Sequence, residues 1–144
     1  MLDEQKTALA TRCLWALQEA AAEIQGLVFT ETRGVPITST MSDVESIQRL
    51  SALSATLFLL GEYAAETWGR GATDEVQLLI RGGRKRGRAA LYVGFKPVGD
   101  SAVLVAVHTG MEPDSPSVDN VDRAARYLDA LLQGEEPPEL RWRE

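Results

Sequence analysis

A histidine and a cysteine are the residues of this chain best suited to catalysis or metal binding. The sequence contains one of each, His108 and Cys13, so they cannot form the ligand cluster of a zinc site. Cys13 falls in a helical pattern, where a free cysteine packs as a small hydrophobic residue. His108 ends an apolar run, and no nucleophile or partner acid is indicated for it, so we assign it a structural role. We expect no catalytic, cofactor-binding or metal-binding residues, and we expect a protein that binds a partner and is not an enzyme.

Three aspartates, Asp114, Asp119 and Asp122, lie around the expected start of the last helix. Their spacing does not match a calcium-binding loop, and acidic side chains near a helix N-terminus are stabilised by the helix dipole. We therefore interpret them as capping and dipole-complementing residues. The glycines form neither a GxGxxG nor a P-loop pattern, so the sequence carries no nucleotide-binding signature.

Residues 81–88 concentrate five basic side chains without an acidic one. Arg84, Lys85, Arg86 and Arg88 are candidate contacts for a phosphate, a polar headgroup or an acidic protein surface. The alternative is a solvated hairpin tip whose charges protect a sheet edge from aggregation, and the sequence leaves both open. The run lacks aromatic residues that stack on bases, and the chain has a net charge of −6, so nucleic acid is not the expected partner.

The N-terminal part of the chain predicts a helix followed by a hairpin. Apolar residues recur at spacings of three and four over residues 3–25, and Gly26 is a typical helix stop. Two short extended runs, 27–31 and 35–39, flank a glycine-containing turn. Pro36 has no amide hydrogen to donate, so it places the second strand at a sheet edge.

The longest predicted element is a helix that begins at the capping box Ser42-Asp43-Val44-Glu45 and continues without proline to about Trp68. Its apolar residues cover about half of the circumference at about 100° per residue, which is wider than the stripe of an ordinary surface helix. They are Ile47, Leu50, Leu53, Leu57, Phe58, Leu60, Ala64, Ala65 and Trp68. The helix is either a well-covered core helix or one that packs on its own sheet and also meets a second surface. Further apolar residues on its polar side favour the second reading.

The C-terminal half predicts three strands, over residues 76–80, 89–95 and 102–107, and then a helix over 117–133 that Ser117 caps. The third of these strands is apolar on both faces, so we expect it to be central in the sheet and covered on both sides. The order of elements is satisfied by one five-stranded antiparallel sheet covered by helices, which is an α+β domain.

Length and composition indicate a single globular domain. The chain has 144 residues, of which 44% are hydrophobic, and we place the domain in residues 1–134. The polar tail 135–144 is expected to be mobile unless Leu140 and Trp142 anchor it. One cysteine excludes an internal disulfide, no signal-peptide pattern is present, and no apolar run approaches the roughly 20 residues that span a bilayer. We expect a cytoplasmic protein without a membrane span.

The order of elements resembles that of the roadblock (dynein light-chain) domain, and four motifs agree with it. The run 29–37 is similar to the first two strands around a polar-glycine turn, and 50–55 to the alanine-rich start of the long helix. Residues 65–71 are similar to the hydrophobic-Gly-x-Gly close of that helix, and 76–80 and 104–107 fill strand positions. The resemblance covers about residues 5 to 130. It implies a profilin-like, three-layer α+β fold with the long helix on one face of the sheet and the terminal helices on the other.

The resemblance also implies a homodimer or a heterodimer, in which the third strands pair edge to edge and the long helices meet, and we expect the homodimer. It thereby assigns a dimer interface to eight residues: Val76, Gln77, Leu78, Leu79, Ile80, Leu57, Ser54 and Gly61.

Bacterial members of the family include MglB-type proteins, which bind and modulate small Ras-like GTPases without hydrolysing nucleotide themselves. The resemblance therefore implies a GTPase partner, and the exposed face of the long helix is its candidate surface, with Gln48, Ala52, Leu59 and Tyr63 as contacts. The alternative is a scaffold or sensor that recruits a kinase or cytoskeletal complex, or binds an anion through the basic run, without a GTPase.

Overall fold

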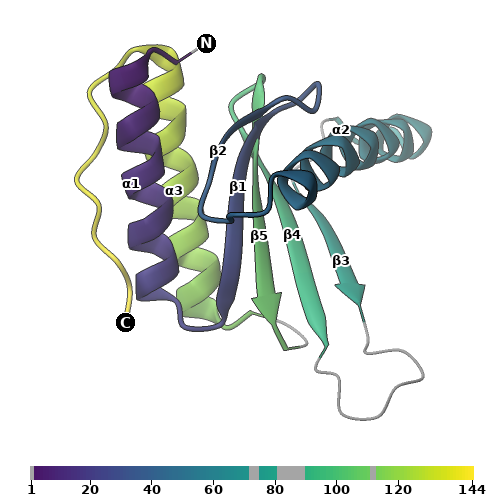
Figure 1. Ribbon diagram of the computed structural model, residues 1–144. Coiled ribbons are helices and arrows are strands. Elements are labelled where there is room, and N and C mark those ends of the chain that lie inside the picture. The colour runs from purple at the N-terminus through teal and green to yellow at the C-terminus, as the bar shows by residue number, and fades with distance from the viewer. Residues whose placement is uncertain (1, 72–74, 81–89, 111–112) are drawn as a thin grey trace.

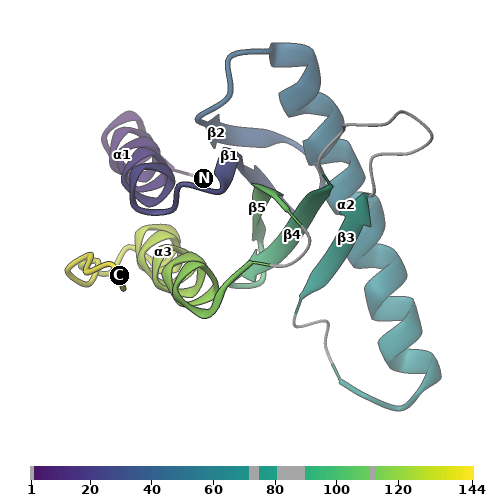
Figure 2. The same ribbon diagram turned by 90° about the horizontal axis from the view of Figure 1, so that it is seen from below.

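The chain folds into a five-stranded antiparallel sheet between two layers of helices (Figures 1 and 2). The computed structural model describes residues 2–71, 75–80, 90–110 and 113–144. The strand order in the sheet is β2-β1-β5-β4-β3. The elements are α1 (Glu4–Ala20), β1 (Ile24–Glu31), β2 (Pro36–Ser39), α2 (Val44–Thr67), β3 (Val76–Ile80), β4 (Leu91–Val98), β5 (Ala102–Thr109) and α3 (Ser115–Gln133).

The two faces of the sheet carry separate cores. On one face, α1 and α3 cover side chains that include Phe29 and Leu104, and on the other α2 covers Val28 and Phe95 (Figure 2). Neighbouring residues of one strand thus enter opposite cores, as the alternation of a strand requires. The predicted α+β fold with three layers is confirmed.

The predicted positions of two strands in the sheet are also confirmed. β2, which contains Pro36, lies at one edge. β5 lies between β1 and β4, and its first five residues are buried. An apolar run covered on both faces is therefore central, and a strand that lacks one amide donor is peripheral.

The end of the first helix differs from the prediction. α1 ends at Ala20, Ala21 is extended, and Ile24 already pairs with His108 of β5. Gly26 lies inside β1, where an added Cβ would sit 2.9 Å from Cγ of Met41. This glycine permits close packing and does not stop a helix, so the prediction that the helix continues to residue 25 is wrong.

The N-terminal caps of α2 and α3 are aspartates and not the serines that the sequence predicts. Asp43, one residue after Ser42, caps α2 by accepting a hydrogen bond from the Glu45 amide at 3.3 Å. Asp114 caps α3 by accepting one from the Ser117 amide at 2.9 Å. Ser117 is therefore inside the first turn of α3 and is not its cap. Aspartate and serine both favour the position before a helix, and here the carboxylates provide the acceptor.

The C-terminal tail, residues 135–144, is anchored to the domain through Leu140 and Trp142. The chain leaves α3 at Gly134, which is left-handed (φ 73°), and returns along α3 and α1 in an extended form (Figure 1). Leu140 and Trp142 contact the core between the terminal helices and the sheet. Among the described helices, none is long and apolar enough to cross a membrane.

Candidate interaction site on the long helix

α2 is held on the sheet by few of its residues. Only Ser51, Ser54 and Phe58 are buried among its 24 residues. Beyond Phe58 every position is exposed or half-buried, because the helix continues past β3 and leaves the sheet behind (Figure 2). The C-terminal half of α2 therefore presents apolar side chains to solvent on more than one side.

The first exposed face of α2 is an apolar stripe. Leu53, Leu57, Leu60, Ala64 and Trp68 follow one another at spacings of four, three, four and four, which places them on one side of a helix. Leu53, Leu60 and Trp68 are 41%, 59% and 80% exposed. The sequence pattern groups Leu60 and Trp68 with the core-facing residues, but the sheet ends before it reaches them. This spacing is typical of a surface that packs against another helix; we call it the stripe.

β3 provides a second unpartnered feature on the side of the molecule toward which α2 extends. It pairs with β4 through one edge, from Val76↔Phe95 to Ile80↔Leu91, and it is the last strand of the sheet in the described part of the chain. Leu79 and Ile80 are 43% and 49% exposed. An uncovered apolar edge strand is a template for pairing with another strand.

The eight residues of the expected dimer interface do not all lie at the surface. The five residues of β3 are half-buried or exposed, and Leu57 and Gly61 on α2 are half-buried. Ser54 is fully buried between α2 and the sheet, so it cannot contact a second chain without a rearrangement of the helix.

The expected partner residues lie on another face of α2. Gln48, Ala52, Leu59 and Tyr63 are all exposed, Leu59 by 63% and Tyr63 by 71%. At about 100° per residue they are centred about 130° from the stripe. We call them the outer face.

A groove of about 440 Å³ adjoins the outer face. Ala55, Leu59 and Glu62 of α2 form one wall, and residues of the β1–β2 and β4–β5 turns form the other. Those turn residues include Thr32, Gly99 and Asp100. Sequence reasoning did not find this groove, because its walls come from three separate segments and no periodicity connects them.

His108 and Cys13 are both buried. His108 is 3% exposed and meets the Tyr92 ring edge to face, with centroids 5.9 Å apart. Burial lowers its pKa, and the charges of Glu23 and Asp114 partly oppose that change. Cys13 is 1% exposed, and burial raises the pKa of its thiol to about 12. The prediction that Cys13 packs as a hydrophobic residue is confirmed.

The three aspartates near the start of α3 have separate structural roles, and the basic candidates are not among the described residues. Asp114 is a helix cap, Asp119 pairs with Arg143, and Asp122 pairs with Lys96 at 3.2 Å. The candidate anion contacts Arg84, Lys85, Arg86 and Arg88 lie outside the described residues.

Comparison with known proteins relates the chain to solved structures. No family model matches the sequence, and no curated protein matches it. MglB of Myxococcus xanthus superposes with a TM-score of 0.75 at 15% identity, over 93% of this chain and 94% of that one. An MglB structure described as having a tetrameric arrangement gives 0.74 at 18% identity, over 93% and 95%. A roadblock/LC7 domain from Streptomyces avermitilis gives 0.74 at 16% identity, over 85% and 97%. The chain has the roadblock/LC7 fold, and the resemblance seen in the sequence is confirmed at the level of the fold.

Proposed function

We propose that this roadblock-fold chain is a cytoplasmic, non-catalytic regulatory module that forms a homodimer and binds and modulates a small Ras-like GTPase. The observation that carries the proposal is that α2 has two exposed apolar faces on a helix with only three buried residues. A monomer seldom leaves so much apolar surface on one element without a partner. Two faces accommodate two partners, a second copy and a different protein.

The stripe and the edge of β3 form the proposed dimer interface. Antiparallel pairing of two β3 strands would continue the sheet across a two-fold axis and cover Leu79 and Ile80. The overhanging half of α2 lies on the same side, so the stripes of two copies would cover each other. Of the eight expected interface residues, the proposal keeps all except Ser54 and adds Leu53, Leu60, Ala64 and Trp68. The tetrameric arrangement described for one MglB agrees with assembly of this fold through more than one surface.

The outer face and its groove form the proposed GTPase surface. Leu59 and Tyr63 provide apolar anchors, and Glu62 and Asp100 place acidic groups in or beside the groove. A surface of this kind modulates a GTPase when it fits one conformation of the switch segments better than another, because it then shifts their populations. The chain does this by contact and needs no catalytic group of its own.

The test is a nucleotide-dependent pull-down with purified small Ras-like GTPases from the same genome. We expect one of them to bind preferentially in one nucleotide state, and Leu59→Glu to weaken that binding by about ten-fold or more, because it places a charge in an apolar contact. Val118→Glu is the matched control, since Val118 is a 43% exposed apolar residue on α3, on the opposite side of the sheet. Binding that ignores the nucleotide, or that Leu59→Glu leaves unchanged, would contradict the GTPase assignment.

A further inference from the structure

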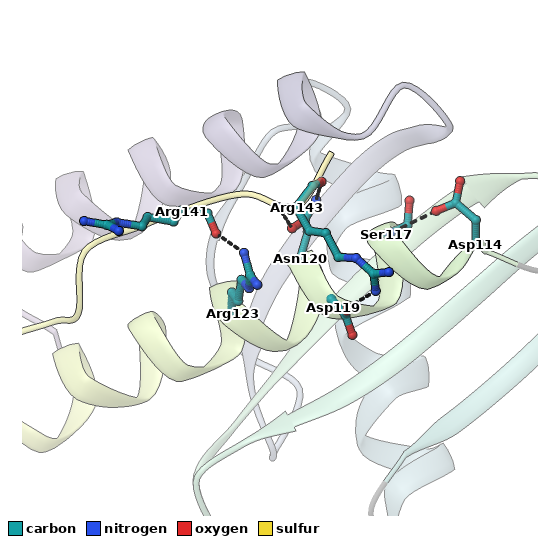
Figure 3. A network of polar contacts seen from close by, with 7 residues as sticks. All are labelled: Asp114, Ser117, Asp119, Asn120, Arg123, Arg141 and Arg143. Carbon is teal, nitrogen blue, oxygen red and sulfur yellow. Dashed lines mark hydrogen bonds and ion pairs between the residues drawn. The ribbon is translucent and has the colours of Figure 1, made fainter.

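The C-terminal tail follows α3 as an extended segment that runs antiparallel to the helix. Arg141 and Arg143 contact α3 residues 18 to 24 positions earlier in the chain (Figure 3). The tail contains no helix or strand. Apart from an ion pair between Arg141 and Glu139, the polar side-chain contacts that hold it are made with the surface that it crosses.

The side-chain amide of Asn120, in α3, binds both the main-chain carbonyl and the main-chain amide of Arg143. Its Nδ2 donates to the Arg143 carbonyl at 2.9 Å, and its Oδ1 accepts from the Arg143 amide at 2.6 Å (Figure 3). Asn120 is 1% exposed, so these are the bonds that satisfy a buried amide. A side-chain amide that pairs with one residue's N–H and C=O recognises extended backbone, as a neighbouring strand would.

Two charged side chains flank this amide pair. Nη1 of Arg123 donates to the Arg141 carbonyl at 2.5 Å, and the Arg143 guanidinium pairs with the Asp119 carboxylate (Figure 3). Three residues on two successive turns of α3 thus contact the tail. We call Asp119, Asn120 and Arg123 the tail site.

The tail alternates like a strand between inward and outward side chains. Leu140 and Trp142 are partly buried on the core between α1, α3 and the sheet, whereas Arg141 and Arg143 are exposed. A space of about 300 Å³ remains between α3 and the tail, lined by Arg123, Arg126 and residues 138–141. The contacts of the tail with the helices lie in Leu140–Arg143, and they consist of two apolar anchors, hydrogen bonds to the main chain and one ion pair.

We propose that the tail site is a docking surface for an extended peptide of a partner protein, and that this chain's own Leu140–Arg143 segment occupies it as a displaceable internal ligand. The partner segment has an apolar residue, an aromatic residue two positions later and a basic residue next. None of the contacts depends on the covalent link through Gly134, so a separate peptide can make all of them. The proposal is independent of the GTPase assignment, because the tail site lies on the opposite side of the sheet from α2 (Figure 2).

The covalent link between the tail and the domain determines how strongly the tail competes with a partner peptide for the tail site. Five residues, 135–139, separate Gly134 from Leu140, and a tether this short gives an effective concentration in the millimolar range. A peptide that binds the empty site with a dissociation constant of about 100 µM would then bind the intact chain about ten-fold or more weakly. The tail thus raises the partner concentration that is needed for binding, but a partner can still reach the tail site.

The experiment uses the full-length chain with Leu140→Ser and Trp142→Ser, which removes the anchors of the tail and keeps its length. A labelled peptide of residues 135–144, EEPPELRWRE, is titrated by fluorescence anisotropy. We expect it to bind this variant about ten-fold or more tightly than it binds wild type. Adding Asn120→Ala should abolish binding, whereas adding Gln133→Ala, at an exposed position on α3 whose side chain donates to Asp129, should not. A peptide with serine in place of both anchors should not bind.

A second measurement uses the wild-type chain and does not depend on the folding of a variant. In amide NMR spectra, excess unlabelled peptide should shift the resonances of residues 140–143 toward unstructured values. The proposal is overturned if a tail-released variant with native circular dichroism does not bind the peptide, or if the wild-type tail resonances stay in place. A dimer that dissociates on Asn120→Ala would also overturn it, since the tail would then be exchanged between two copies.

Discussion

Replacement of Phe58 by alanine tests how α2 is held on the sheet. Phe58 is the only large side chain of α2 that is buried, with 8% exposure, and it contacts a core that includes Val28, Phe95 and Val105. Replacement of a buried phenylalanine by alanine lowers the free energy of unfolding by about 3–5 kcal/mol. Phe58 also borders the groove beside the outer face, so solvent can enter part of the space that alanine would leave. We therefore expect a loss near the lower end, about 3 kcal/mol in the free energy of unfolding.

The assay is urea unfolding followed by far-ultraviolet circular dichroism, at one fixed protein concentration because a dimer's stability depends on concentration. The neighbouring Leu59→Ala is the matched control. Leu59 is 63% exposed, so its loss should change the free energy of unfolding by about 0.5 kcal/mol or less. A cost below about 1 kcal/mol for Phe58→Ala, or a cost for Leu59→Ala as large as that for Phe58→Ala, would show that Phe58 does not hold α2 on the sheet.

Three further predictions concern buried polar groups. The buried Ser54 hydroxyl has no hydrogen-bond partner among the described residues. Ser54→Ala should therefore raise the free energy of unfolding by about 1 kcal/mol in the same urea assay, and a destabilised variant would contradict this. At about pH 8, Cys13 should react with a thiol reagent far more slowly in the native protein than in the unfolded protein. A pKa of about 12 leaves roughly a thousandth of the usual fraction of thiolate, which is the reactive form. Equal rates would show that the thiol is accessible in the native protein. His108 has a pKa below 6.5 in the folded chain, so the unfolded chain binds its proton more readily, and stability should fall as the pH drops below about 6.5. His108→Gln should flatten that dependence between about pH 7.5 and 5.5, and an unchanged slope would show that other groups cause it.

Local chemistry predicted those elements in which one residue restricts the backbone or one pattern dominates. Pro36 placed β2 at a sheet edge, and the apolar run of β5 placed that strand in the centre. Both inferences rest on hydrogen bonds that a strand can or cannot make, so they need no knowledge of distant contacts.

Boundaries that depend on distant partners were not predictable in this way. The helical spacing continues to Ile24, yet pairing with His108 of β5 and burial draw this residue into a strand. Gly26 looks like a helix stop until Met41 is seen to occupy the place of its missing Cβ. A periodicity reports which residues share a face but not which segment will cover that face.

The same limit applies to the candidate site. The pattern of α2 indicated a second surface, but it did not show that the sheet ends near Phe58 and leaves Leu60 and Trp68 uncovered. It also placed Ser54 at an interface, whereas the helix buries this residue against its own sheet. The docked tail was foreseen only as two apolar residues, because Asn120 gives no sign in the sequence that it binds the main chain of Arg143.

Light scattering coupled to size-exclusion chromatography tests whether the two exposed faces of α2 have separate roles. At micromolar concentration we expect wild type to have twice the 15.7 kDa mass of the chain. Leu60→Glu, in the stripe, should give a folded monomer, whereas Leu59→Glu, on the outer face, should remain a dimer. A wild-type protein that is monomeric, or two variants that behave alike, would show that the two faces of α2 do not have these separate roles.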